Sequence, residues 1–86
     1  MEHMLEFMKK YDALKVKHPE LYLHISEFSK AKKWRIHIYA RNLGRAGDAE
    51  LACVEDENRE EAFKSAAVAI EKIDGQIDNL KKWNTD

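Results

Sequence analysis

The chain has 86 residues, a length that suits a single domain (residues 1–86) with a modest core. Apolar residues make up 44% and charged residues 36%, which is typical of a globular protein and excludes a wholly disordered chain. Cys53 is the single cysteine, so an intrachain disulfide and zinc-finger spacing are both excluded. The early Glu2 and the lack of a long apolar run predict neither a secretory signal nor a membrane span, and we expect a cytoplasmic protein with no membrane partner.

Charge is distributed unevenly along the chain, although the net charge is only -1. Residues 21–47 contain six basic residues and one acidic residue, a balance of +5, whereas residues 48–86 contain eleven acidic and five basic residues, a balance of -6. The small net charge argues against a general electrostatic attraction to nucleic acid. The basic middle and the acidic end therefore have to be considered separately.

The first predicted element is a helix over residues 2–18. Its apolar residues recur at steps of three and four, which places them on one face: Met4, Phe7, Met8, Tyr11 and Leu14. Pro19 disfavours helical geometry in the residue before it, so the helix should end near His18.

A β-hairpin is predicted over residues 21–41. Leu21, Leu23 and Ile25 alternate with polar and aromatic residues, and residues 34–40 alternate in the same way. A turn centred on Lys30 and Ala31 brings the two apolar faces together, because a slip of one residue would turn every side chain to the wrong side. The predicted register pairs Ile25 with Ile36, Leu23 with Ile38, His24 with His37, and Tyr22 with Tyr39.

The rest of the sequence, from residue 42 onward, predicts a loop, a strand and a long helix. Residues 42–48 contain two of the three glycines and read as a loop. In the following strand, about residues 49–55, Leu51 and Cys53 should continue the buried face. Asn58 and Glu61 form a capping-box pattern for a helix reaching Trp83, with a weak point at Gly75 and last turns that overhang the sheet. The fold class is therefore α+β: a two-layer α-β-β-β-α arrangement in which both helices cover one face of a three-stranded antiparallel meander.

The outer face of the hairpin is the first candidate binding site. Aromatic rings alternate there with basic groups, a mixture that suits RNA or an acidic protein surface: Tyr22, His24, Arg35, His37, Tyr39 and Arg41. The turn over residues 29–33 adds three lysines, Lys30, Lys32 and Lys33. Alternatively, the rings only stabilise strand pairing and the lysines only discourage aggregation.

The long helix carries a second candidate, an apolar stripe formed by Ile73, Ile77, Leu80 and Trp83. Beyond the sheet, this stripe could form a homodimer or bind another protein, unless the first helix covers it. No metal site or cofactor is predicted, because His24 and His37 offer only two nitrogen ligands. With Cys53 expected in the core and no phosphate-binding loop, we expect no enzymatic activity.

The element order, together with residues 59–67 (REEAFKSAA), resembles the double-stranded-RNA-binding domain. That resemblance implies RNA binding through the start of the last helix, where the family has three cations. Here Arg59 is basic, whereas Glu60 and Phe63 occupy the other two places. The final helix, with its AAVAIEKIDGQI stretch, is similar to that of ribosome hibernation factors, although the first strand of that family is missing.

We expect a non-enzymatic binding module, an adaptor or inhibitor of the kind that phages and mobile elements encode. It would contact a protein partner through the hairpin face and the C-terminal helix. The alternative is an RNA- or ribosome-binding protein that uses the basic hairpin, residues 30–45.

Overall fold

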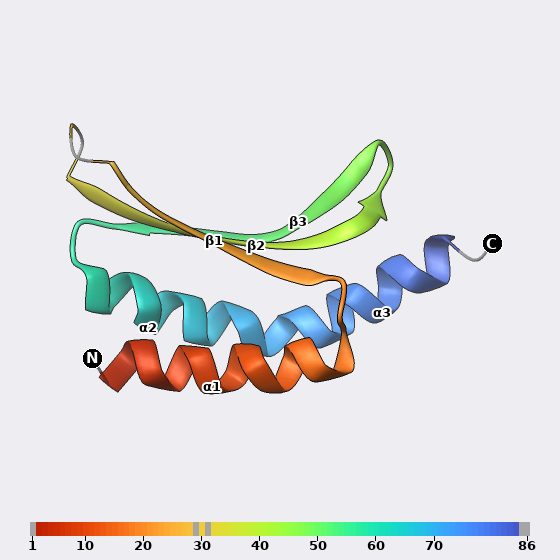
Figure 1. Ribbon diagram of the computed structural model, residues 1–86, viewed down its shortest axis with the longest axis horizontal. Coiled ribbons are helices and arrows are strands. Elements are labelled where there is room, and N and C mark those ends of the chain that lie inside the picture. The colour runs from red at the N-terminus through yellow and green to blue at the C-terminus, as the bar shows by residue number, and fades with distance from the viewer. Residues whose placement is uncertain (1, 29, 31, 85–86) are drawn as a thin grey trace.

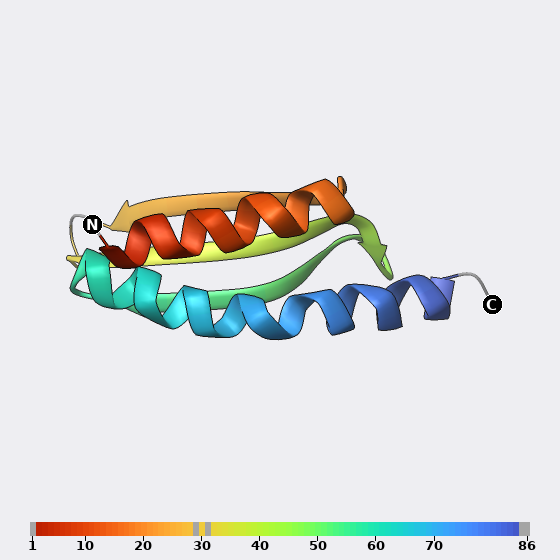
Figure 2. The same cartoon turned by 90° about the horizontal axis from the view of Figure 1, so that it is seen from below.

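The computed structural model describes residues 2–28, 30 and 32–84. Its elements are α1 (Glu2–Lys17), β1 (Leu21–Phe28), β2 (Lys33–Gly44), β3 (Gly47–Asp56), α2 (Arg59–Ala69), the 3₁₀ turn η1 (Ile70–Lys72) and α3 (Ile73–Asn84). The strands form one antiparallel sheet in the order β1-β2-β3, and all the helices lie on one face of it (Figures 1 and 2). The predicted α+β class and the α-β-β-β-α order are confirmed. Within the described part of the chain, no helix combines the length and apolar composition needed to cross a membrane.

The hairpin formed by β1 and β2 has the predicted register, with all four expected pairs opposite one another. On its inner face Leu21, Ile36 and Ile38 are fully or almost fully buried, as the alternating pattern requires. Ile25 is opposite Ile36 and points the same way, but it is 39% exposed. Leu21 on the same edge strand is fully buried, so the helices cover the Leu21 end of β1 better than its middle.

The core lies between the sheet and the helix layer. The ring of Phe7, on α1, lies 5.6 Å from the ring of Phe63 on α2 and 6.2 Å from that of Tyr11. Small residues on α2 allow the backbones to approach closely, and larger ones continue the buried face toward the C-terminus: Ala62, Ala66, Ala67, Ile70, Ile73 and Ile77. The long helical segment is therefore anchored to the same core from its first turn as far as Ile77.

The long helix begins as predicted, with the Asn58 side chain accepting a hydrogen bond from the Glu61 backbone N–H at 3.1 Å. In a capping box, the Glu61 side chain would accept a hydrogen bond from the Asn58 backbone N–H. Here the Asp56 carboxylate accepts that hydrogen bond instead, at 2.9 Å. The helix tightens at η1 and then passes through Gly75 as α3, so it does not end early at this residue. A 3₁₀ turn aligns residues three apart, which suits the buried pair Ile70 and Ile73.

The connection between β2 and β3 differs from the predicted loop over residues 42–48. The strands continue to Gly44 and restart at Gly47, which leaves a two-residue turn, Arg45 and Ala46. A Cβ atom at Gly44 would lie 2.9 Å from the Asp48 carbonyl oxygen, so the close approach of the strands requires glycine there. Two irregularities interrupt the β2–β3 register, and this end of the hairpin curls away from α3 (Figure 1).

Candidate functional site

The outer face of the sheet carries the row of aromatic and basic side chains that the hairpin pattern predicts. The rings of Tyr22 and Tyr39 stack with their centroids 5.0 Å apart, and His37 stacks on Tyr39 at 5.8 Å. The guanidinium of Arg41 lies 5.3 Å from the centroid of the Tyr22 ring. His24 lies opposite His37, with ring centroids 6.0 Å apart. The sheet therefore brings together four rings and a cation from two strands.

Acidic side chains of β3 share this face, which the sequence did not reveal. The Arg35 Nε atom lies 2.7 Å from a Glu55 carboxylate oxygen, and the Tyr22 hydroxyl donates a hydrogen bond to Asp48 at 2.7 Å. The latter bond lowers the pKa of Asp48 below its usual value and raises the pKa of Tyr22. These acids balance the bases of the hairpin, so the face is mixed in charge.

Cys53 lies on the outer face and is exposed, which corrects the expectation that it belongs to the core. The cause is the irregularity in the register: Ile38 pairs with Ala52 and Tyr39 pairs with Glu50, so Leu51 is an extra residue. Leu51 packs against the core, and the alternation is reset after it. Partial burial raises the pKa of the Cys53 thiol, and the carboxylate of Glu50 raises it further. This environment does not activate the thiol as a nucleophile.

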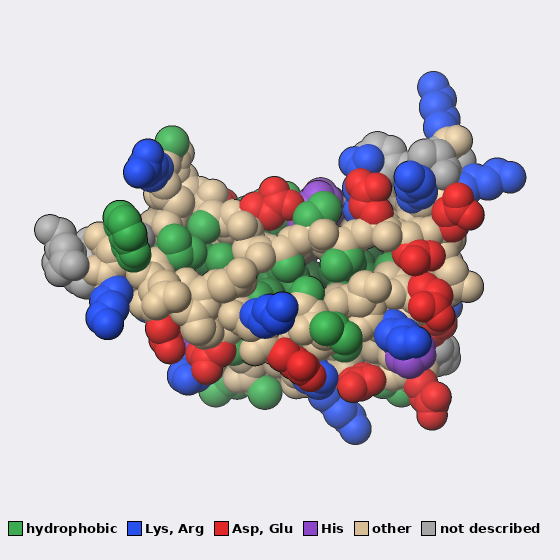
Figure 3. Space-filling model, turned by 180° about the vertical axis from the view of Figure 1, so that it is seen from behind, with side chains coloured by type: hydrophobic (Ala, Val, Ile, Leu, Met, Phe, Trp, Pro, Cys, Tyr) green, Lys and Arg blue, Asp and Glu red, His purple; other side chains and the backbone are tan. Residues whose placement is uncertain are grey.

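The basic turn lies at the end of the sheet opposite the β2–β3 turn, and Figure 3 shows cationic side chains projecting there, with acidic side chains nearby. Lys30 and Lys32 are exposed, whereas Lys33 is half-buried at the start of β2. Ser29 and Ala31, which complete the predicted turn, lie outside the described residues. The structure thus places two exposed lysines at this tip.

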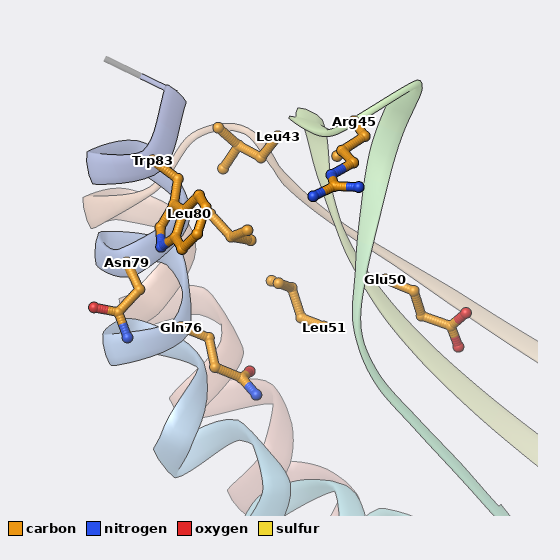
Figure 4. Close-up of a pocket in the computed structure, with 9 residues that line it drawn as sticks. Leu43, Arg45, Glu50, Leu51, Gln76, Asn79, Leu80 and Trp83 are labelled. Carbon is orange, nitrogen blue, oxygen red and sulfur yellow. The ribbon is translucent and has the colours of Figure 1, made fainter. Parts of the chain in front are cut away.

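An apolar groove lies at the other end of the molecule, between α3 and the curled end of the β2–β3 hairpin. It has a volume of about 600 Å³ and is open to solvent on one side. Figure 4 shows Leu43 and Leu51 from the strands facing Leu80 and Trp83 from α3. The Arg45 side chain points toward the groove, whereas the Glu50 carboxylate points away from it. In Figure 3, hydrophobic side chains gather in the hollow at this end.

Only part of the predicted apolar stripe on the last helix is accessible to a partner. Ile73 and Ile77 are fully buried in the core and have no surface to offer a partner. Leu80 is half-buried at the groove, and Trp83 is 78% exposed. The stripe therefore has two parts, a buried half that anchors α3 and an accessible half at the groove.

A buried histidine ties α3 to the end of α1, a role that the sequence did not suggest. The His18 Nε2 atom lies 2.6 Å from an Asp74 carboxylate oxygen, and the His18 Nδ1 atom lies 3.2 Å from the Lys81 Nζ. Because an ammonium group can only donate, Nδ1 accepts the bond from Lys81 and Nε2–H donates to Asp74. Lys81 also lies 2.6 Å from Glu20. This network fixes the direction of α3 and hence one wall of the groove.

The three positions behind the resemblance to the double-stranded-RNA-binding domain lie at the start of α2. Arg59 covers the Trp34 ring at 5.7 Å, and Phe63 is buried in the core. Comparison with protein-family models, curated proteins and solved structures finds no match for the chain. What the chain binds is therefore inferred from its own groove and sheet face.

Proposed function

We propose that this chain is a non-enzymatic protein-binding module, an adaptor or inhibitor that holds an apolar segment of a partner protein in the groove beside α3. The observation that carries the proposal is the 78% exposure of Trp83 at the edge of an apolar groove. An exposed apolar patch that contains an aromatic residue and has a polar rim is characteristic of protein interfaces. Trp83 has the size and rigidity of an interface hot spot.

The groove favours an amphipathic helix that carries an acidic residue. It is open on one side, so it suits a partner laid along it better than a small molecule enclosed within it. Leu43, Leu51 and Leu80 supply the apolar floor. Arg45 is exposed and directed toward the groove, where it can pair with a carboxylate of the partner. The partner helix should therefore present apolar residues at helical spacing and an acid at the end near Arg45.

RNA or ribosome binding is the competing function. Two of the exposed cations that favour it, Lys30 and Lys32, lie at the end of the sheet away from the groove, although Arg41 and Arg45 of the same hairpin are exposed as well. Arg35, which would have to contact phosphate, is already 2.7 Å from Glu55. A protein partner is therefore favoured, and we place the module in the cytoplasm because its exposed thiol suits a reducing compartment.

Capture from cell extract with matched variants tests the proposal. The wild type, Trp83→Ala and the control Val16→Ala would be immobilised, since Val16 is 84% exposed on α1 and lies outside the groove. With nuclease present and at high salt, we expect the wild type and the control to retain the same protein and Trp83→Ala to lose it. With that partner purified, Trp83→Ala should weaken binding by about 2 kcal/mol or more, which is about thirtyfold in Kd.

Two results would contradict this function. Equal retention of the partner by Trp83→Ala would exclude the groove as the binding site. Retention of RNA that is lost steeply with salt and with Lys32→Ala, but not with Trp83→Ala, would establish the RNA-binding alternative. A dimeric wild type that becomes monomeric on Trp83→Ala would identify a second copy of the chain as the occupant.

A further inference from the structure

The geometry points to a transition-metal site on the outer face of the sheet, formed by His37, Glu50 and Cys53 with His24 as the fourth ligand. One ligand atom from each of the first three residues lies within 4.8 Å of the other two. The site shares Glu50 with the edge of the groove, but the Glu50 carboxylate points away from the groove, and the site does not depend on the proposed function. Its occupant would be a Zn²⁺-like divalent ion, for which thiolate, imidazole and carboxylate are the usual ligands.

The irregularity in β3 builds this cluster. Glu50 and Cys53 are three residues apart, so in a regular strand their side chains would point to opposite faces. Because Leu51 is an extra residue in the ladder, both instead lie on the outer face, where His37 is directly opposite Cys53. Irregularities of this kind are often found where a strand has to direct a side chain toward a site.

The distances approach those of a tetrahedral site. Zinc bonds of about 2.0–2.3 Å place neighbouring ligand atoms about 3.3–3.8 Å apart. The His37 Nδ1 atom and a Glu50 carboxylate oxygen are already 3.3 Å apart. Glu50 and Cys53 are exposed, so small side-chain rotations can close the remaining gap.

His24 completes the set from the third strand. Its ring centroid lies 6.0 Å from that of His37. Two imidazoles bound to the same zinc ion have centroids about 5 Å apart, given bonds of about 2.0–2.1 Å. His24 is exposed, so its ring can rotate toward the ion. Four ligands from three adjacent strands would then surround one ion: one from β1, one from β2 and two from β3.

The surroundings distinguish this cluster from the other group of potential ligands, His18, Asp74 and Asp78. There, the Lys81 Nζ atom lies 3.2 Å from the His18 Nδ1 atom. The positive charge of Lys81 would repel a metal ion bound at that position. At the sheet face the Arg35 Nε atom lies 2.7 Å from a Glu55 carboxylate oxygen. Glu55 thus offsets the charge of Arg35, while Glu50 remains beside His37 and Cys53.

Titration with Co²⁺ tests the site on the whole chain, kept reduced with a phosphine that does not bind metal. We expect one equivalent to produce the visible absorption of tetrahedral Co²⁺ together with a thiolate-to-cobalt charge-transfer band, and Zn²⁺ to displace it. Cys53→Ser should abolish the charge-transfer band. His37→Gln, Glu50→Gln and His24→Gln should each weaken binding by about tenfold or more. The control His3→Gln removes a histidine from α1, on the other side of the sheet, and should bind as the wild type does.

Circular dichroism checks that each variant is still folded. We expect it to be unchanged, because these side chains lie on the outer face of the sheet and their replacement should leave the fold intact. Absence of saturable one-to-one binding in the wild type would overturn the site. A charge-transfer band that persists in Cys53→Ser would do the same, as would equal weakening by His3→Gln and His37→Gln. Unchanged affinity in His24→Gln would overturn the role of His24 as the fourth ligand.

Discussion

Ile77 and Trp83 lie on the same helix, and truncating each to alanine should have very different effects on stability. Ile77 is fully buried, and Ile77→Ala removes three carbon atoms from the core. The transfer free energy is about 0.8 kcal/mol per buried methylene, and the cavity adds to it, so we expect a loss of about 3 kcal/mol. At about 0.05–0.15 kcal/mol per residue the whole domain is stable by about 4–13 kcal/mol, so this is a large fraction. Trp83→Ala should change stability by about 0.5 kcal/mol or less, because the side chain is 78% exposed.

Urea unfolding followed by the helical circular dichroism signal measures both changes. With a denaturant dependence of about 1.5 kcal/mol per molar, Ile77→Ala should lower the midpoint by about 2 M, and Trp83→Ala should leave it almost unchanged. The slopes of the three curves should agree, since the surface exposed on unfolding is similar. Equal shifts for the two variants would refute the packing of α3 against the sheet, and with it the groove.

Three further predictions concern acid stability and the glycines. In the folded protein, a hydrogen bond from Lys10 lowers the pKa of Glu71, and hydrogen bonds from His18 and Lys17 lower the pKa of Asp74. As the pH falls, these carboxylates are therefore protonated in the unfolded chain before they are protonated in the folded protein. The stability from these carboxylates is complete above about pH 5 and is lost progressively below about pH 4, as the pH falls through the lowered folded-state pKa values. Urea midpoints measured against pH should therefore fall mainly below about pH 4, less steeply for Asp74→Asn. Gly44→Ala should lower the thermal midpoint, with a cost of about 1–3 kcal/mol, because the new Cβ would lie 2.9 Å from a backbone oxygen. Gly75→Ala should raise it by the equivalent of about 0.5–1 kcal/mol, since nothing lies within 4 Å of the new Cβ in α3; a lower midpoint would show that the helix is not regular there.

Local sequence signals were sufficient for the element order and the hairpin register. The alternation of Leu23 with His24 and of Ile36 with His37 allows only one parity of pairing when one face must be buried, and the structure has that register. The Asn58 cap was predictable for a similar reason, because its side chain bonds to a backbone group three residues away.

The candidate site was predictable only in part. Tyr22, His24, His37 and Tyr39 lie on the outer face as alternation requires, but alternation alone could not show that Cys53 joins them. The extra residue in β3 depends on how this strand pairs with β2, and single-strand periodicity carries no information about such pairing. The uninterrupted apolar run at residues 51–54 (LACV), which lacks strict alternation, is a local signal that could have suggested it.

The class, the strand order and the side of the hairpin that faces the helices are predictable from the order of the residues, because helix and strand periodicity are local properties of the chain. Which half of the Ile73–Trp83 stripe is buried depends instead on tertiary packing. The curled β2–β3 hairpin leaves Trp83 exposed, while the bond between His18 and Asp74 holds the start of α3 against α1. Contacts between residues far apart in the chain create both the groove and the histidine–cysteine cluster, and for that reason neither was visible in the order of the residues.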